Sequence, residues 1–481
     1  MTPGLPTTTP RRDRVLFWRL LVLLLVLYNL NFRTIHSNDS LPARYLPFSL
    51  LLHHSLYLDP WVKPFVGVPI GPDGMYFVAK FRGHWISSYP ILEPLLITPL
   101  YVFPAWWLSR QSPPPAPNGS LFVLVADTME KLIASLIAAF SGGLLFLALR
   151  KIAPPMASFV VALIYGLAAN TWAISSQALW RQGLTELAFA FLLWALFRLP
   201  ESPRAPFWVG LALGVAAVNK HLEVLLVFPF LVYFAFFFEP GGEGRTGPDG
   251  PRREPRPVSA QRSWRRRGKT LLLFLVPVAA LGGLALAYNL HFFAKPQGSR
   301  HLVPQPLWGS VAGLLVSPSR GLLVYTPWAV FALWGAARIW KENLWGWGRP
   351  LILGLVAVFV GQAGLNEQWW GGWCFGPRYL TDLLPFLACF LIPVWPRISA
   401  GRVLRVVFAA TVVFALWVQV IGAFYYKPGI WDSDPVSIDF RPQRLWDWRD
   451  NQLLRSWKAG LAPPDLIGGW MVVREGSHKQ E

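Results

Sequence analysis

Long runs of apolar residues, separated by short polar or charged stretches, recur along the whole chain. A helix that crosses a bilayer satisfies its own backbone hydrogen bonds and needs about 20 mostly apolar residues. Runs of roughly this kind lie at 15–31, 131–149, 270–290, 321–337, 350–366, 378–395 and 403–424. The pattern predicts an all-α, polytopic integral membrane protein. No small-residue cleavage site follows the first run, so we interpret it as a retained first span.

Basic residues gather in the short connections, where they report topology. Arg11, Arg12, Arg14 and Arg19 predict a cytoplasmic N-terminus, and the basic, Gly- and Pro-rich segment 239–269 is predicted to be a flexible cytoplasmic loop. Alternation of the spans then predicts four exoplasmic stretches. These are a large first loop at 31–90, a loop at 291–320, a short one at 367–377 and the tail 425–481.

The number of spans between 91 and 238 is less clear from the pattern. Six candidates can be drawn there, at 91–108, 119–149, 156–171, 184–197, 205–219 and 222–238. The first span leaves the cytoplasm, and the basic loop at 239–269 is predicted to lie in the cytoplasm. The interval between them must therefore contain an odd number of spans. The six candidates here and the six runs outside this interval make twelve spans, a total that is therefore wrong by one. We predict about 11–13 transmembrane helices in a domain that covers 1–424. Either 91–108 or the charged 119–149 run is interfacial or broken.

Composition narrows the function classes. The chain has 481 residues, 54% of them hydrophobic and 15% aromatic, with a formal charge of +19. The bases do not cover one groove-sized face, so nucleic-acid binding is not expected. Cys374 and Cys389 would lie about 20 Å apart on a regular helix, too far for a disulfide. The adjacent His53 and His54 cannot serve one metal from one helix face, so no metal site is predicted.

A carboxylate follows the first span at Asp39, within HSNDSLPARYL. Held near the membrane surface and partly desolvated, it could act as the general base for a hydroxyl acceptor. The same residues also fit a helix N-cap, and the local sequence does not decide between the two. Tyr89 and Pro90 close the first loop, where a proline at a helix start is ordinary unless the tyrosine has a partner.

Further polar residues stand at the exoplasmic ends of apolar runs. Arg181 and Gln182 lie at a helix entrance, with Thr185 and Glu186 a turn further in, where such side chains either face a cavity or snorkel to the interface. Lys220 stands between two apolar runs. We include Arg181 and Lys220 among the candidate binding residues.

Exoplasmic cations run against the positive-inside trend. Four lie in the 291–320 loop, at Lys295, Arg300, His301 and Arg320, and a lipid phosphate or pyrophosphate would explain them.

The stretch EQWWGGWCFGPRYLTD adds Arg378, whose planar fork suits a phosphate, beside Trp369, Trp370 and Tyr379. An aromatic belt is the plain alternative for the tryptophans. Three glycines in this stretch favour an ordered loop instead, because a belt needs no special backbone dihedrals. Glu367 and Asp382 have no assigned role beyond holding an arginine in place.

Taken in order, these motifs resemble the bacterial membrane glycosyltransferases of the GT-C superfamily, which depend on polyprenyl-phosphate sugars and include protein mannosyltransferases and aminoarabinose transferases. The resemblance rests on the acid after the first span, YP, SQALWRQG, the YN segment with PQGSR, SPSRG and WWGGWCFGPRYL. It implies an inverting transfer at the bacterial plasma membrane, from a polyprenyl-phosphate donor to an exoplasmic acceptor.

The resemblance also implies roles for residues. Asp39 would be the base or acceptor-orienting group, and Arg378, then Arg320 and Arg300, with Lys220 as a weaker candidate, would stabilise charge on the leaving phosphate. Trp369, Trp370 and Tyr379 would line the sugar. The paired acids of metal-dependent members are absent around Asp39, so we predict no divalent metal and no other cofactor. A transporter or flippase of a lipid-linked saccharide is the alternative function.

Overall fold

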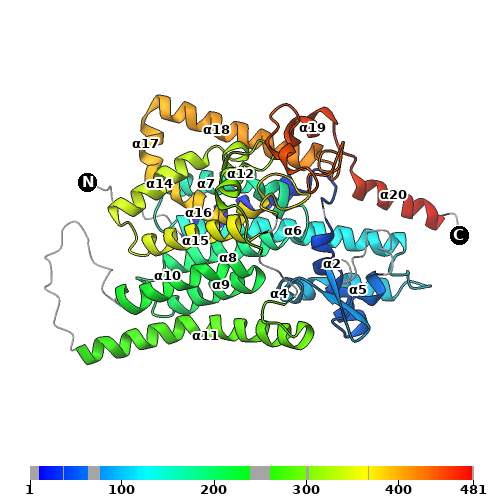
Figure 1. Ribbon diagram of the computed structural model, residues 1–481, viewed down its shortest axis with the longest axis horizontal. Coiled ribbons are helices and arrows are strands. Elements are labelled where there is room, and N and C mark those ends of the chain that lie inside the picture. Colours follow the sequence, from blue (N-terminus) through cyan, green and yellow to red (C-terminus); the bar gives the residue numbers. More distant parts are fainter. Residues whose placement is uncertain are drawn as a thin grey trace.

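The computed structural model describes residues 10–35, 37–62, 76–238, 260–298, 303–366 and 368–478. The described chain is a bundle of helices with one small two-stranded sheet (Figure 1). Five of its helical segments are long and apolar enough to cross a membrane: Ser120–Leu149, Arg265–Phe293, Gly348–Leu365, Arg378–Ala400 and Arg402–Tyr425. The predicted fold class, an all-α polytopic membrane protein, is confirmed.

The first half of the chain contains the first helix, the segments of the predicted first loop and the first group of long helices. Its elements are α1 Pro10–Asn29, η1 Asn38–Ser40, α2 Leu41–His53, α3 Asp59–Val62, β1 Val78–Phe81, β2 His84–Ser87, α4 Leu92–Ile97, η3 Thr98–Tyr101, α5 Val102–Ser109, α6 Ser120–Leu149, α7 Pro155–Leu167, η4 Thr171–Ser175, α8 Arg181–Leu196, α9 Ala205–Asn219, η5 His221–Leu226, α10 Val227–Val232 and η6 Tyr233–Phe237.

The second half begins with the longest helix and ends with the short helices of the tail. Its elements are α11 Ala260–Phe293, α12 Leu307–Val316, α13 Leu322–Tyr325, α14 Ala329–Glu342, α15 Gly348–Leu365, η7 Arg378–Leu383, α16 Leu384–Phe390, η8 Ile392–Val394, α17 Trp395–Ala400, α18 Arg402–Val420, η9 Ile421–Tyr425, η10 Pro442–Trp446, α19 Gln452–Lys458 and α20 Asp465–His478.

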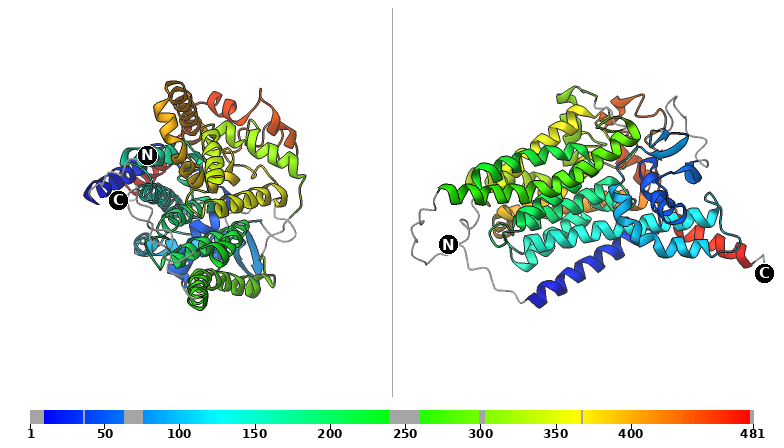
Figure 2. Two further views of the ribbon diagram at one scale, coloured as in Figure 1. Left: turned by 90° about the vertical axis from the view of Figure 1, so that its left-hand side faces the viewer. Right: turned by 90° about the horizontal axis from the view of Figure 1, so that it is seen from below.

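The bundle has two distinct ends. At one, which we call the basic end, Arg150 bonds Asp13, Lys151 pairs with Glu201, and Arg338 bonds the carbonyl of Pro393. The other, the site end, carries the β1–β2 hairpin, α2 and α19 (Figures 1 and 2). Residues predicted to be cytoplasmic thus gather at one end, and the predicted exoplasmic ones at the opposite end. Which end faces the cytoplasm stays a prediction.

Several shorter helices of the described chain accompany the five long segments. Those that are apolar and 10–17 residues long are α7, α9, the segment His221–Phe237 and α12. Between 91 and 238 the longer helical segments are α6, α7, α8, α9 and His221–Phe237, and the number of spans in this interval stays a prediction. The candidate at 91–108 is the broken one: it forms α4, η3 and α5 in succession, with prolines at 94, 99 and 104 removing backbone donors. The 119–149 run is the single helix α6.

The predicted flexible loop at 239–269 needs one correction. Residues 239–259 lie outside the described residues, but from Ala260 onward the chain is already helical and continues into the span. The stretch after the last proline of the loop, at 257, is rich in arginine, which favours helix, so the basic residues from 265 to 269 form the first turns of α11 rather than a loop.

The first loop packs on α6 and explains the charges within that helix. Arg44 on α2 forms an ion pair with Asp127 and a second, at 2.6 Å, with Glu130. Apolar residues of α2, such as Leu46 and Phe48, share a buried cluster with α6. A buried guanidinium between two carboxylates fixes α2 against the bundle, and Asp39 lies just before α2.

The described part of the tail from 426 onward buries apolar side chains against the bundle. Its buried Trp431, Ile438 and Leu445 belong to the main apolar core, and Leu453 packs with Phe375 and Tyr426. Trp470 on α20 donates to the hydroxyl of Thr128 on α6 at 3.1 Å. The tail is therefore docked onto the site end of the bundle.

Candidate active site

Asp39 lies on the short helical turn η1, between α1 and α2. The cap of this turn is Ser37, whose hydroxyl accepts a hydrogen bond from the backbone N–H of Asp39 at 3.1 Å. The carboxylate itself bonds two side chains: Tyr89 donates its hydroxyl to Oδ1 at 2.8 Å, and Arg378 donates Nη1–H to Oδ2 at 2.6 Å. The helix-cap interpretation of Asp39 is therefore wrong, because Ser37 is the cap and the Asp39 carboxylate bonds two side chains instead.

The β1–β2 hairpin brings two tyrosines to this carboxylate. Val78 pairs with Ser87 in the antiparallel register, and continuing that register sets Tyr76 opposite Tyr89. Both hydroxyls hydrogen-bond to Asp39. Burial first, then the charge of Asp39, raises the pKa of each phenol above its ordinary value. Both tyrosines therefore remain protonated donors toward Asp39.

Two guanidinium groups, those of Arg378 and Arg181, lie beside the Asp39 carboxylate. Arg378 is 8% exposed, and its guanidinium carbon lies 4.7 Å from the ring centre of Trp180 and 5.5 Å from that of Tyr379. Arg181, at the first turn of α8, stacks over the ring of Tyr89 at 4.6 Å. The two cations come from distant parts of the chain and meet at one carboxylate.

Each of these arginines keeps a buried N–H group without an acceptor among the described residues. The groups are Nε of Arg378 and Nη1 of Arg181. An unsatisfied buried donor on a charged group costs on the order of 1–3 kcal/mol or more, and a bound acceptor would offset this cost. The arrangement can therefore accept an anion beside Asp39.

The charge state of Asp39 follows from its neighbours. Burial acts to raise its pKa, but the guanidiniums of Arg378 and Arg181 and the hydroxyl of Tyr89 together outweigh burial and lower the pKa below its ordinary value. Asp39 is thus an ionised carboxylate at neutral pH. While paired to Arg378 it is also a weak base.

Lys220 lies behind this cluster, at the junction of α9 and η5. It is 4% exposed and bonded to Asp382, with Glu223 at 3.7 Å. Asp382, which the sequence left unassigned, is one helical turn beyond Arg378 and holds a lysine rather than an arginine. In this arrangement Lys220 supports the segment that carries Arg378.

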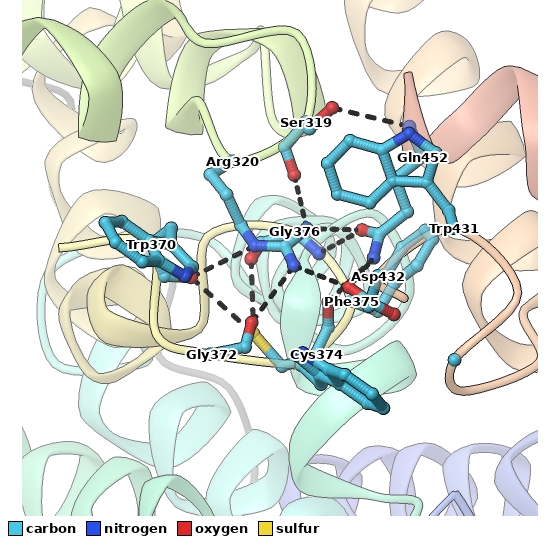
Figure 3. Close-up of polar contacts among 12 residues, drawn as sticks. Ser319, Arg320, Trp370, Gly372, Cys374, Phe375, Gly376, Trp431, Asp432 and Gln452 are labelled. Carbon is cyan, nitrogen blue, oxygen red and sulfur yellow. Dashed lines mark hydrogen bonds and ion pairs between the residues drawn. The ribbon is translucent and has the colours of Figure 1, made fainter. Parts of the chain in front are cut away.

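Arg320 is the hub of a separate, fully buried network (Figure 3). Its five N–H groups donate to the carbonyls of Trp370, Gly372 and Ser319, to Gln452 Oε1 and to Asp432 Oδ1, all at 2.8–3.1 Å. All of its donors are occupied by protein acceptors, unlike those of Arg378. The sequence predicted both arginines as phosphate ligands, but the structure leaves only Arg378 with a free donor.

This network fixes the loop that precedes Arg378. Gln452 on α19 accepts from the N–H of Gly376 at 3.0 Å and donates to the carbonyl of Cys374 at 2.8 Å. Gly371, Gly372 and Gly376 all have positive φ, between 61° and 78°. The ordered loop expected from the three glycines is confirmed, and the tail determines its shape.

Trp369 and Trp370 belong to this loop rather than to the Asp39 cluster. Trp369 packs tightly over Gly313 of α12, and Trp370 donates its indole N–H to Asp439 of the tail at 3.2 Å. Trp180, which the sequence analysis did not single out, lies beside Arg378 instead. Arg300, His301 and Glu367 lie outside the described residues.

The structure therefore brings together Asp39, Tyr89, Arg181, Arg378 and Tyr379 among the predicted site residues. It adds Tyr76 and Trp180. A signal for Tyr76 was present in the sequence, because Arg82-Gly83 separates the alternating runs VAKF and HWIS as a two-residue hairpin turn does. No cluster of three or more metal-ligating side chains occurs in the described residues.

Comparisons with known proteins give little at the sequence level: no family model matches the chain, and no curated protein matches it. Among solved structures, it is similar to ArnT from Cupriavidus metallidurans in a crystal structure bound to undecaprenyl phosphate. The sequence identity is 13%, the TM-score is 0.44, and the match covers 96% of this chain and 76% of that one. A likeness at this level assigns neither a function nor a residue's role.

Proposed function

We propose that this protein transfers a sugar from a polyprenyl-phosphate donor to a hydroxyl acceptor at the site end of the bundle, with inversion. The acceptor oxygen attacks the anomeric carbon as the bond from that carbon to the phosphate oxygen breaks. The acceptor proton passes to the carboxylate of Asp39, and polyprenyl phosphate leaves with the electron pair. The bilayer holds the donor's chain, and no cofactor takes part.

One observation carries this proposal. Asp39 is ionised and lies beside two guanidiniums, Arg378 and Arg181, each with a buried N–H that no described acceptor satisfies. Transfer from a lipid phosphate needs these two elements side by side: a base for the acceptor and fixed cations for the departing phosphate. The faces of Trp180 and Tyr379 beside Arg378 would stabilise positive charge that develops on the sugar.

The proposal changes the parts given to several predicted residues. Arg378 and Arg181 bind the phosphate, while Arg320 and Lys220 hold the segments around Arg378. Trp369 and Trp370 shape the preceding loop. Arg300 and His301 remain predicted phosphate ligands.

The Asp39–Arg378 ion pair also gives the site an order of events. A phosphate that binds Arg378 competes with Asp39 for the same guanidinium. As Arg378 turns to the phosphate, the carboxylate loses the interaction that lowers its pKa most strongly and gains an anionic neighbour, and both changes raise its basicity. The base is thus activated only when a donor is bound.

The test is a transfer assay in membranes supplied with labelled polyprenyl-phosphate sugars. We expect Asp39→Asn to slow transfer by about 10²- to 10⁴-fold, the usual contribution of a general base. Asp59→Asn is the matched control, since Asp59 is also a first-loop acid but binds His84 and the N–H of Trp85. The control should transfer at the wild-type rate.

Two results would overturn the proposal. Wild-type transfer by a correctly inserted Asp39→Asn protein removes Asp39 as the base. Label that reaches the other side of the membrane still attached to its polyprenyl chain, with no new glycoside formed, identifies a flippase instead.

A further inference from the structure

A second candidate site lies at the basic end, far from Asp39. A cavity of about 350 Å³ opens between the α8–α9 connection and the first turns of α11. Ligand pockets begin at about 300 Å³, so this space suits a headgroup rather than a whole lipid. Nothing in the proposed reaction uses it.

One face of α11 supplies a wall of the cavity. Arg266, Lys269, Thr270 and Leu273 all line it, and their spacing of three and four residues places them on the same side of the helix. The apolar run of α11 begins directly after Thr270. The two cations therefore stand where the basic part of the helix meets the part that is apolar enough to cross a membrane.

The charges in the cavity do not cancel. Its carboxylate, Glu201, accepts two hydrogen bonds from Lys151, at 2.7 and 3.1 Å, and is neutralised by that pair. Arg266 and Lys269 are both exposed, and the described residues give neither of them an acidic partner. The cavity thus presents two cations and one carboxylate that is already paired.

The remaining surroundings are apolar. Leu199 and Phe238, each less than a tenth exposed, line the cavity opposite α11. Only 17% of the apolar part of α11 is buried in the protein, and Leu272 and Val276 in that part are 63% and 49% exposed. Hydrocarbon chains could lie along the exposed apolar part of α11, which follows the two cations in the helix.

We propose that this cavity binds the phosphate headgroup of an anionic diacyl phospholipid. Arg266 and Lys269 pair with the phosphate, and the acyl chains extend along the exposed face of α11. Basic pockets between membrane helices bind such headgroups by this combination of charge and apolar contact. This inference is independent of the glycosyltransferase proposal, because it requires no catalysis.

The test measures lipid binding by the purified full chain. The delipidated protein in detergent is titrated with dioctanoyl phosphatidylglycerol or dioctanoyl phosphatidylcholine, and bound lipid is counted by native mass spectrometry. We expect phosphatidylglycerol to bind at least tenfold more tightly. The double variant Arg266→Gln with Lys269→Gln should bind phosphatidylglycerol at least tenfold more weakly than the wild type does. Thr270→Phe, which fills the cavity without a charge change, should weaken binding as well.

The matched control is Lys341→Gln with Arg402→Gln. These cations are exposed at the same end of the bundle on α14 and α18, and neither lines the cavity. The control should lose less than twofold in affinity. An equal loss in both double variants would show general surface charge and overturn the site. Equal affinity for the two lipids, or full displacement by millimolar inorganic phosphate, would overturn an anionic-lipid site too.

Discussion

Asp39 and Arg378, which are 339 positions apart in the sequence, form a 2.6 Å ion pair at the centre of the candidate site. The pair holds the first loop against the segment that enters the span Arg378–Ala400. It also determines how the site responds to pH.

The first prediction concerns Arg378→Gln. Without the guanidinium the pKa of Asp39 rises, and we expect burial to outweigh Arg181 and Tyr89 and to take the pKa above its ordinary value. In the wild type, the lowered pKa contributes stability above the unfolded pKa of about 3.9, and that stability is lost as pH falls through the folded value. In the variant the raised pKa destabilises the protein at neutral pH, and acidification relieves the penalty.

The melting-temperature gap between wild type and Arg378→Gln should therefore narrow from pH 7.5 to pH 5. Asp39→Asn combined with Arg378→Gln is the control, because it removes the titrating group. A gap that is independent of pH, or the same pH response in the double variant, would contradict the assignment.

The second prediction concerns Arg320 and Asp432. Both side chains are fully buried, so Arg320→Gln or Asp432→Asn alone leaves an unpaired buried charge and should cost about 3–5 kcal/mol. Because the partners share one interaction, the double variant should cost less than the sum of the two.

The comparison pair is Arg455 and Asp434, an exposed ion pair in the same tail. Its single substitutions should change stability by no more than about 1 kcal/mol. Apparent unfolding free energies in detergent measure both cycles. Equal costs in the two cycles would show that the Arg320 network does not hold the tail.

The third prediction compares two glycines. Gly376 has φ +61° and Gly460 φ +71°, so alanine is strained at both. At Gly376, however, the added Cβ would lie 2.6 Å from the ring of Tyr325, whereas the space at Gly460 is open. Gly376→Ala should therefore lower the melting temperature well beyond Gly460→Ala.

We also expect Gly376→Ala to reduce transfer, because it displaces the loop just before Arg378. Transfer and melting are measured on the same preparations. If the two alanine variants behave alike, the contact with Tyr325 does not constrain the loop.

The fourth prediction tests how the first loop is held. Arg44 is 2% exposed and is the shared partner of Asp127 and Glu130. Arg44→Gln leaves two carboxylates facing each other and should cost about 3–5 kcal/mol. Lys151→Gln, which breaks the exposed pair with Glu201, should cost less than about 1 kcal/mol. Protease sensitivity of the first loop should rise in Arg44→Gln alone.

The sequence predicted the spans well where a single apolar run decides the structure. The long helices near 131–149, 270–290, 350–366 and 403–424 all exist, because lipid allows a backbone little other than helix. The interval 91–108 was ambiguous because apolar content and three prolines make opposite demands. The first turns of α11 were missed because composition alone marked them as loop.

The site was only half predictable for a different reason. Charge topology could place Asp39, Tyr89, Arg181 and Arg378 on one side of a membrane, but it could not give their contacts. Arg320 and Arg378 look alike in the sequence, since each is a cation at the predicted exoplasmic end of an apolar run. What separates them is Asp432, 112 positions beyond Arg320, and no local pattern reports a partner at that distance.

The two hydrogen bonds that Gln452 makes with the backbone of Gly376 and Cys374 have a consequence for biosynthesis. A ribosome makes Asp39, Arg181 and Arg378 well before it makes Gln452. These groups are therefore inserted while the loop before Arg378 still lacks its hydrogen bonds with Gln452. Chains interrupted between 378 and 452 would carry the complete set of reacting groups, but Gln452 would not yet hold that loop. The protein would then become able to transfer sugar only after the last part of the tail is made, and it would be inactive while its helices assemble.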